Sequence, residues 1–208
     1  MLFRTREEAG KFLAEKLKRY KNRKDVIILA IPRGGVPVAY SIAKALNLKF
    51  DLIIPRKLPI PFDPEAGFGA VINNTIVLNE ELLERIHLSK NEINNIIKEV
   101  REEIKRRNKE YRKRKPFPNL KNKTVILVDD GLASGYTMLA AVRDIKKTAK
   151  KVIVAVPTAS LSAFNKVKKE ADVISLQVSN ERIFAVASFY MSFPDLADKE
   201  VINYLENQ

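Results

Sequence analysis

The fold of this chain is decided by the stretch TVILVDDGLASGYTM, which runs from Thr124 to Met138. Four apolar residues, Val125 to Val128, form a continuous run that is typical of a buried strand. Two acidic residues follow, and a glycine-containing turn then leads into a helical pattern. Backbone N–H groups and the positive end of a helix dipole converge on such a turn, with Ser134 and Thr137 hydroxyls beside them. The stretch therefore predicts a strand, a phosphate-binding turn and a helix start.

Similar apolar runs occur on both sides of this stretch, and helical patterns lie between them. Strands that are apolar on both faces belong in parallel sheets covered by helices. Alternating strands and helices indicate right-handed β-α-β crossovers. The sequence thus predicts an α/β fold with a doubly wound, mainly parallel sheet of about five strands flanked by helices. The other expected strands are 26–31, 50–54, 152–156 and 173–176, and the expected helices are 6–20, 36–46, 137–147 and 160–169.

In such sheets, ligands bind in the crevice beyond the carboxyl ends of the strands. Each of the segments that follow an expected strand carries unusual residues. The sequence therefore predicts that these segments meet around a ligand: Pro32 to Gly35, Pro55 to Lys57, Asp129 to Thr137, and Pro157 to Ser160.

The middle of the chain follows a different pattern. Prolines and glycines crowd the segment Leu58 to Gly69, which predicts a loop able to close over the crevice. A hairpin is expected over Ala70 to Leu78. A long helix with one apolar stripe is expected over Ser89 to Tyr111, and a basic run, Arg112 to Lys115, follows it.

Composition narrows the class of protein. The chain has 208 residues, no cysteine and a single histidine, which favours one domain and argues against disulfides and zinc chemistry. Its first residues lack the pattern of a signal peptide, and prolines and glycines interrupt Val26 to Leu46, the most apolar stretch. We therefore expect a cytoplasmic protein without a membrane span. A formal net charge of +13 predicts attraction to polyanions, either nucleic acid, anionic lipid or phosphorylated metabolites.

Other phosphate-binding motifs are missing from the sequence. It contains neither G-x-x-x-x-G-K-[ST] nor G-x-G-x-x-G. The segment Val125 to Met138 resembles the signature of type I phosphoribosyltransferases. The similarity extends to Ala30 to Pro37 and to Arg56 to Leu58, as in a bacterial and archaeal subgroup of that family whose acceptor is generally unassigned.

This resemblance implies one phosphoribosyltransferase-like domain over residues 1–208. Its core would cover about 1–79 and 120–180, and a helical hood about 80–118 with the C-terminal segment 181–208. The acids Asp129 and Asp130 would contact ribose hydroxyls, and Mg²⁺ would lie near them through substrate and water, without a direct protein ligand. The 5-phosphate would be wrapped by the phosphate turn: Gly131, Leu132, Ala133, Ser134, Gly135, Tyr136 and Thr137.

The same resemblance assigns the diphosphate group to the Arg33 loop, which comprises residues 32–35 and contributes Arg33, Gly34 and Gly35. A glycine pair after a strand exposes N–H groups, and a guanidinium recognises phosphate oxygens in a planar, multidentate way. Arg56 and Lys57 would add positive charge, either as part of the site or as a solvated basic pair.

The implied reaction transfers ribose 5-phosphate from 5-phosphoribosyl 1-diphosphate to a nitrogenous base, with a purine-like base as the expected acceptor. C-terminal aromatic residues offer stacking surfaces for a base or belong to the core: Phe184, Phe189, Tyr190 and Phe193. The alternative is a regulator that senses the phosphoribosyl ligand and binds nucleic acid through the basic helix, although specific binding is not expected from its mixed charges. A homodimer is compatible with both functions, the enzyme and the regulator.

Overall fold

The computed structural model describes residues 1–113 and 115–207, and the side chains of all of these except 64 and 65. Its centre is a parallel sheet in which the strands follow the order β2-β1-β6-β7-β8. The predicted doubly wound α/β fold is therefore confirmed. The strands are β1 (Val26–Ala30), β2 (Lys49–Leu52), β6 (Thr124–Val128), β7 (Lys151–Ser160) and β8 (Asp172–Ser179).

Helices cover both faces of this sheet, which explains why its strands are apolar throughout. In β6, Ile126 and Val128 face one apolar cluster, whereas Val125 and Leu127 face the other. The first cluster includes α1 (Arg6–Lys16) and α2 (Gly35–Leu46), and the second includes α5 (Tyr136–Ile145) and α6 (Leu161–Lys168). Successive side chains of a strand point to opposite faces, so a run buried on both sides needs helices on both sides.

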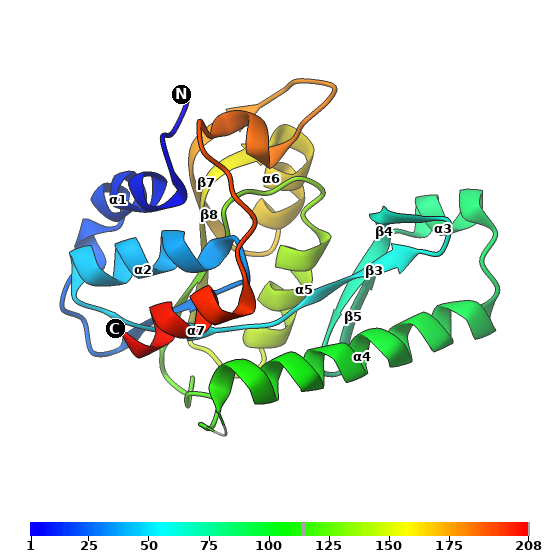
Figure 1. The fold of residues 1–208 in the computed structure, drawn as a ribbon, viewed down its shortest axis with the longest axis horizontal. Coiled ribbons are helices and arrows are strands. Elements are labelled where there is room, and N and C mark those ends of the chain that lie inside the picture. Colours follow the sequence, from blue (N-terminus) through cyan, green and yellow to red (C-terminus); the bar gives the residue numbers. More distant parts are fainter. Residues whose placement is uncertain (114, 208) are drawn as a thin grey trace.

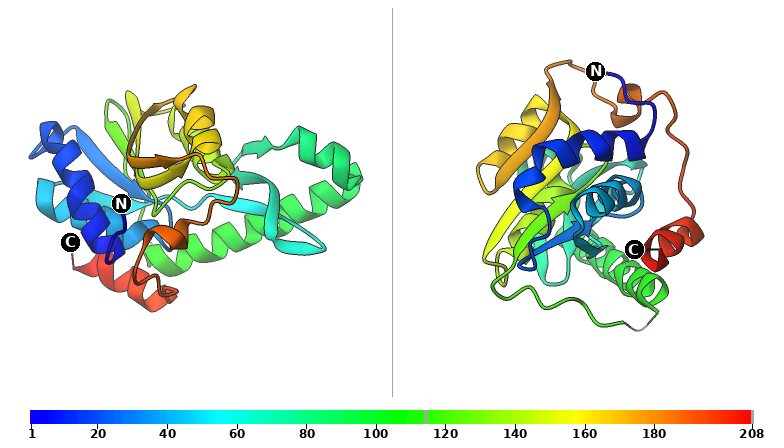
Figure 2. Two further views of the ribbon diagram at one scale, coloured as in Figure 1. Left: turned by 90° about the horizontal axis from the view of Figure 1, so that it is seen from above. Right: turned by 90° about the vertical axis from the view of Figure 1, so that its left-hand side faces the viewer.

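A second unit, the arm (residues 56–112), projects beside α5 (Figures 1 and 2). Its antiparallel sheet is formed by β3 (Arg56–Ile60), β4 (Asp63–Ile72) and β5 (Thr75–Leu78). The sheet packs on α3 (Glu80–Ile86) and α4 (Lys90–Arg112), with a separate apolar cluster between them. Its buried members are Leu58, Ile60, Phe68, Val71, Ile97 and Ile104.

The expectation of a loop over 58–69 is wrong, because β3 and β4 form most of this segment. The prolines fit because β3 is an edge strand and its register shifts on both sides of Pro59, opposite Gly67. Edge strands and bulges are the places where a sheet tolerates a residue without an N–H group. Pro61 lies in the turn that follows β3. The predicted hairpin turn between β4 and β5 is confirmed, with Ile72 paired to Thr75.

The N-terminal residues pair with the segment that precedes the last helix. Phe3 donates its N–H to the carbonyl of Phe189 at 2.9 Å and accepts from the N–H of Met191 at 2.7 Å. Two short elements complete this region, η1 (Lys18–Tyr20) after α1 and η2 (Val186–Phe189) before the last helix. That helix, α7 (Asp198–Glu206), packs against α2 and α4.

Within the described ranges, 1–113 and 115–207, none of the helices is both long and apolar enough to cross a membrane.

The packing of α1 on α2 yields a prediction about Gly10. A Cβ at this position would lie 2.5 Å from the carbonyl oxygen of Val38 and 2.8 Å from Cβ of Ser41. Overpacking of this kind typically costs about 1–3 kcal/mol, whereas alanine returns up to about 1 kcal/mol of helix propensity. We expect Gly10→Ala to lower the free energy of unfolding in a urea titration. Lys11→Ala, an exposed position of the same helix, should change it little. A Gly10→Ala protein as stable as the parent would contradict this packing.

Candidate functional site

A cleft of about 330 Å³ lies at the carboxyl ends of β1 and β6, where the sequence placed the ligand. It brings together residues of three of the four predicted segments, namely the Arg56 segment, the phosphate turn and the Arg33 loop. Among the described residues of the Arg33 loop, Pro32 lines the cleft, whereas Arg33, Gly34 and Gly35 do not. The fourth segment, Pro157 to Ser160, lies within β7 and supports the phosphate turn from behind. The residues that line the cleft are Ile31, Pro32, Pro55, Arg56, Lys57, Asp129, Gly131, Leu132, Ala133, Ser134, Gly135, Thr137, Met138 and Val186.

The phosphate turn is held by contacts to its carbonyl groups. The carbonyl of Leu132 accepts from the N–H of Ser160 at 2.9 Å, and that of Ala133 accepts from the Ser160 hydroxyl at 2.7 Å. The carbonyl of Ser134 accepts from Nζ of Lys166 at 2.8 Å. The N–H of Leu132 also donates to β7, to the carbonyl of Thr158 at 2.9 Å. The start of α5 at Gly135 has no side-chain cap, so N–H groups of its first turn can meet an anion.

Two further features shape this turn. Gly135 has φ of 79°, in the left-handed region that favours glycine, and α5 begins directly after it. Lys166 lies with its ammonium 3.5 Å from the ring centroid of Tyr136, and burial lowers the pKa of this lysine. Sequence reasoning missed Lys166, because its partner Ser134 is 32 residues away in the chain.

The two acids at the end of β6 occupy different positions. Asp129 is one of the cleft-lining residues, and its Oδ1 accepts from the N–H of Asp130 at 2.9 Å. Asp130 forms an ion pair with Arg6 at 2.9 Å. Burial and the neighbouring negative charge of Asp130 raise the pKa of Asp129 well above its usual value. Burial also raises the pKa of Asp130, although the Arg6 guanidinium opposes this shift.

The Arg33 loop packs directly on these acids. A Cβ at Gly34 would lie 1.9 Å from Oδ2 of Asp130, and a Cβ at Gly35 would lie 2.8 Å from Cα of Asp129. Both glycines are therefore required by close packing and not merely by turn geometry. The peptide bond between Pro32 and Arg33 is cis.

Cationic side chains from three elements gather near the cleft. Arg33 lies 3.7 Å from the carboxylate of Asp198 in α7. Burial, together with the positive charges of Arg107 and Arg33, lowers the pKa of Arg56. Among the described residues that line the cleft, Arg56 and Lys57 carry the positive charge. Arg33 and Arg107 lie outside this lining and pair with the carboxylates of Asp198 and Glu103.

Arg107 and Asp198 were not predicted from the sequence. Arg107 donates to the hydroxyl of Tyr111 at 3.3 Å, and Tyr111 donates to Asp198 at 2.5 Å, which links α4 through α7 to Arg33. Burial raises the pKa of Tyr111 to about 12. The helical spacing of Ile104, Arg107 and Tyr111 places all three on one face of α4, and this signal could have identified Arg107.

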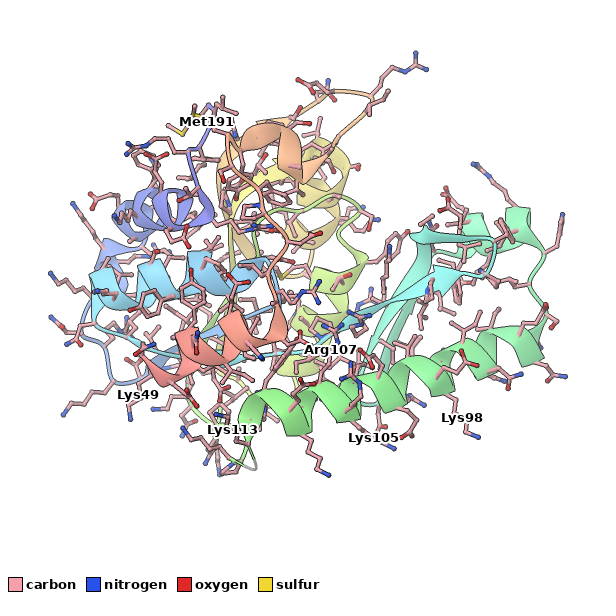
Figure 3. All side chains as sticks on the ribbon, viewed as in Figure 1. Lys49, Lys98, Lys105, Arg107, Lys113 and Met191 are labelled. Carbon is pink, nitrogen blue, oxygen red and sulfur yellow. The ribbon has the colours of Figure 1, made fainter. Side chains whose placement is uncertain are left out.

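Exposure separates Arg107 from Lys105, a cation on the outer side of α4. Its side chain is 11% exposed, whereas that of Lys105 is 72% exposed. Figure 3 shows Arg107 on the side of α4 that faces the core, with Lys98 and Lys105 on the opposite side.

The C-terminal aromatic residues divide into two pairs. Tyr190 and Phe193 lie 5.1 Å apart, and Tyr190 also contacts the ring of Phe3 at 5.5 Å, so this pair belongs to a packed cluster. Phe184 and Phe189 form a separate tilted pair at 5.2 Å. Between the members of this second pair, Val186 lines the cleft. Phe189 packs against the same cluster as Tyr190 and Phe193, and none of the four aromatic residues is among the described residues that line the cleft.

Comparisons with known proteins agree with this geometry. The phosphoribosyl transferase domain family matches residues 3–58 and 74–193, and the chain therefore belongs to this family. The "Putative phosphoribosyl transferase Rv0571c" of Mycobacterium tuberculosis is 33% identical over 207 residues, which cover 99% of this chain and 46% of that protein. The chain thus spans about half the length of the curated relatives it matches.

Solved structures show the same fold. The protein TT1426 from Thermus thermophilus is 32% identical, with a TM-score of 0.80, and the match covers 100% of this chain and 99% of that one. The AQ2163 protein from Aquifex aeolicus shares the fold at 16% identity, with a TM-score of 0.53 over 83% of this chain and 74% of that one. These findings confirm the resemblance identified in the sequence.

The raised pKa of Asp129 yields a pH prediction. The unfolded-state pKa of aspartate is about 3.9, so above that pH the native state binds more protons than the unfolded state and stability falls as pH rises. Asp129→Asn removes this loss while keeping the hydrogen bond from the Asp130 N–H. We expect the melting temperature of the variant minus that of the parent to grow between about pH 4 and 8.

Asp172→Asn is the matched control, because pairing with Lys151 lowers the pKa of Asp172. Its melting temperature relative to the parent should not rise with pH. A difference between Asp129→Asn and the parent that stays constant over the whole range would show that Asp129 is not destabilised by burial.

Proposed function

We propose that this protein is a phosphoribosyltransferase that uses 5-phosphoribosyl 1-diphosphate and Mg²⁺ to transfer ribose 5-phosphate to a nitrogenous base. The observation that carries the proposal is the convergence, on one cleft, of the phosphate turn, the carboxylate of Asp129 and the cations of the Arg56 segment. These three groups match the 5-phosphate, the ribose hydroxyls and the diphosphate of the donor. Because all three line the same cleft, a single extended ligand can engage them together.

The reaction breaks the bond between C1 of the ribose and a diphosphate oxygen, and forms a bond from C1 to a nitrogen of the base. Positive charge develops at C1, so the protein has to orient the two reactants and stabilise the leaving group. In the proposed roles, Arg33, Arg56 and Lys57 neutralise diphosphate, and the N–H groups of the phosphate turn fix the other end of the donor. The proton of the attacking nitrogen leaves to the departing diphosphate or to solvent, so the step needs little acid–base machinery from the chain.

The residues present fit a magnesium ion that is held mainly by the donor. Asp129 offers a hard carboxylate oxygen, which Mg²⁺ prefers and would reach through water. Within the described part of the chain, no group of three or more His, Cys, Asp or Glu side chains forms a metal site. When bound, Mg²⁺ would neutralise charge on the leaving diphosphate. The chain itself would orient the ribose through Asp129.

We extend the proposal to a purine-like acceptor. The apolar part of the cleft wall is formed by Ile31, Met138 and Val186, and a flat aromatic heterocycle suits such a wall. The aromatic pair of Phe184 and Phe189 adjoins Val186 in the chain and supplies a stacking surface.

The alternative function, a regulator that binds nucleic acid through α4, has less support. Some of the cations on this helix are paired with neighbouring carboxylates: Lys105 with Glu102, and Arg106 with Glu103 and Glu110. A phosphate backbone would have to displace these partners. Any binding should therefore be weak and should fall steeply between two salt concentrations in a filter-binding assay.

The function is tested by product formation with 5-phosphoribosyl 1-diphosphate, Mg²⁺ and a panel of purine and pyrimidine bases. We expect turnover with at least one base. Asp129→Asn should lower kcat/KM by about 10- to 100-fold, because a hydrogen bond to a charged group contributes roughly 1.5–3 kcal/mol. Asp172→Asn, remote from the cleft, should not change it. No product with any base and no binding of the donor would refute the proposal.

The phosphate turn is tested separately with inorganic phosphate. Lys166→Met removes the donor to the Ser134 carbonyl while keeping an unbranched side chain of similar length, so the turn should lose its shape. We expect the Kd for phosphate, measured by calorimetry, to rise about 5- to 10-fold. Lys168→Met is the control, because this lysine points to Phe164 in the same helix. Equal affinities in the two variants would contradict the role given to Lys166.

A further inference from the structure

The acidic pair at the end of β6 is not symmetric. Asp130 is tied to Arg6 of α1 by an ion pair of 2.9 Å between Nε and Oδ2. The side chain of Arg6 is 8% exposed and that of Asp130 is 14% exposed. A guanidinium that is buried to this extent needs a counter-charge, and Asp130 supplies it.

Arg6 also holds the C-terminal segment in place. It donates through a second nitrogen to the carbonyl of Pro194 at 2.8 Å, and its guanidinium lies 3.6 Å from the ring centroid of Phe193. The hydroxyl of Tyr190 donates to the backbone carbonyl of Asp130 at 2.7 Å. The acid, the first helix and the C-terminal segment therefore form one buried network.

The same carboxylate is the surface on which the Arg33 loop rests. A Cβ at Gly34 would lie within 3.1 Å of both carboxylate oxygens of Asp130. The loop backbone thus packs on the acid, and movement of this side chain would displace the loop.

Asp129 differs from Asp130 in its position relative to the cleft. Among the described residues, the cleft lining includes Asp129 but not Asp130. A ribose hydroxyl that used Asp130 would have to share a carboxylate already engaged by Arg6 and covered by Gly34.

We propose that the two acids have separate roles, an inference that rests on the proposed function. Asp129 alone binds the ribose hydroxyls. Asp130 is a positioning residue that, together with Arg6, fixes the Arg33 loop and the C-terminal segment at the edge of the cleft. Arg6 is thereby a determinant of the site, although it does not face the ligand.

The test compares Asp129→Asn, Asp130→Asn, Arg6→Met and the double variant Arg6→Met/Asp130→Asn with the parent. Asp130→Asn leaves a buried guanidinium without its counter-charge, whereas the double variant removes both charges and keeps side chains of similar size. Affinity for 5-phosphoribosyl 1-diphosphate with Mg²⁺ is measured by calorimetry. Hydrogen exchange without ligand is measured over the Arg33 loop and over residues 189–194.

We expect Asp129→Asn to lose affinity about 10-fold or more while its exchange stays at the parent level. Asp130→Asn and Arg6→Met should each lose affinity and exchange faster in both segments. The double variant should bind the donor more tightly than Asp130→Asn, because no unpaired buried charge remains, but more weakly than the parent, because the contact from Arg6 to the Pro194 carbonyl is lost. If Asp130→Asn does not fold, the donor affinity and the hydrogen exchange of the double variant alone test the inference.

A double variant that binds the donor as weakly as Asp130→Asn, with parent-like exchange, would show that Asp130 contacts the ribose directly and would overturn the inference. Unchanged exchange in Asp130→Asn would also overturn it. If the parent does not bind the donor, the proposed function fails. The roles of Asp130 and Arg6 in holding the two segments are then decided by the exchange data alone.

Discussion

The parallel pairing of β1 with β6 is the constraint on which the cleft depends. In this register Ala30 lies beside Val128, so the two strands end together and the segments that follow them emerge at one point of the sheet edge. The Arg33 loop and the acidic pair are brought into contact by this pairing alone. The glycines then allow the loop backbone to approach the carboxylates more closely than any side chain would permit. A shift of one residue would separate the groups and reverse the buried faces.

The second requirement is the direction of peptide groups in the phosphate turn. Ser160 and Lys166 engage carbonyl groups on its outer side, and the start of α5 leaves N–H groups on its inner side. An anion site of this kind uses backbone dipoles that are already oriented before the ligand arrives. Support from β7 and α6 is therefore as important for the site as the residues that touch the ligand.

Local sequence carried most of the information about the core sheet and the phosphate turn, because buried runs and glycine turns are local patterns. The arm was misread, since a proline such as Pro59 breaks a regular strand in most settings and only its position in an edge strand permits it here. Arg6 and Lys166 could not be assigned, because their partners are 124 and 32 residues away. Such contacts arise from tertiary packing, and no spacing in the sequence encodes them.

The network around Arg6 also has an evolutionary consequence. Arg6 of α1 forms a buried ion pair with Asp130 at the end of β6, and its guanidinium also lies over the ring of Phe193. Positions 6, 130 and 193 should therefore covary among relatives, with loss of the arginine accompanied by loss of the acid. Position 34 has no such freedom, because any side chain there would overlap the carboxylate of Asp130. Every relative that retains an acid at position 130 should therefore retain glycine at position 34.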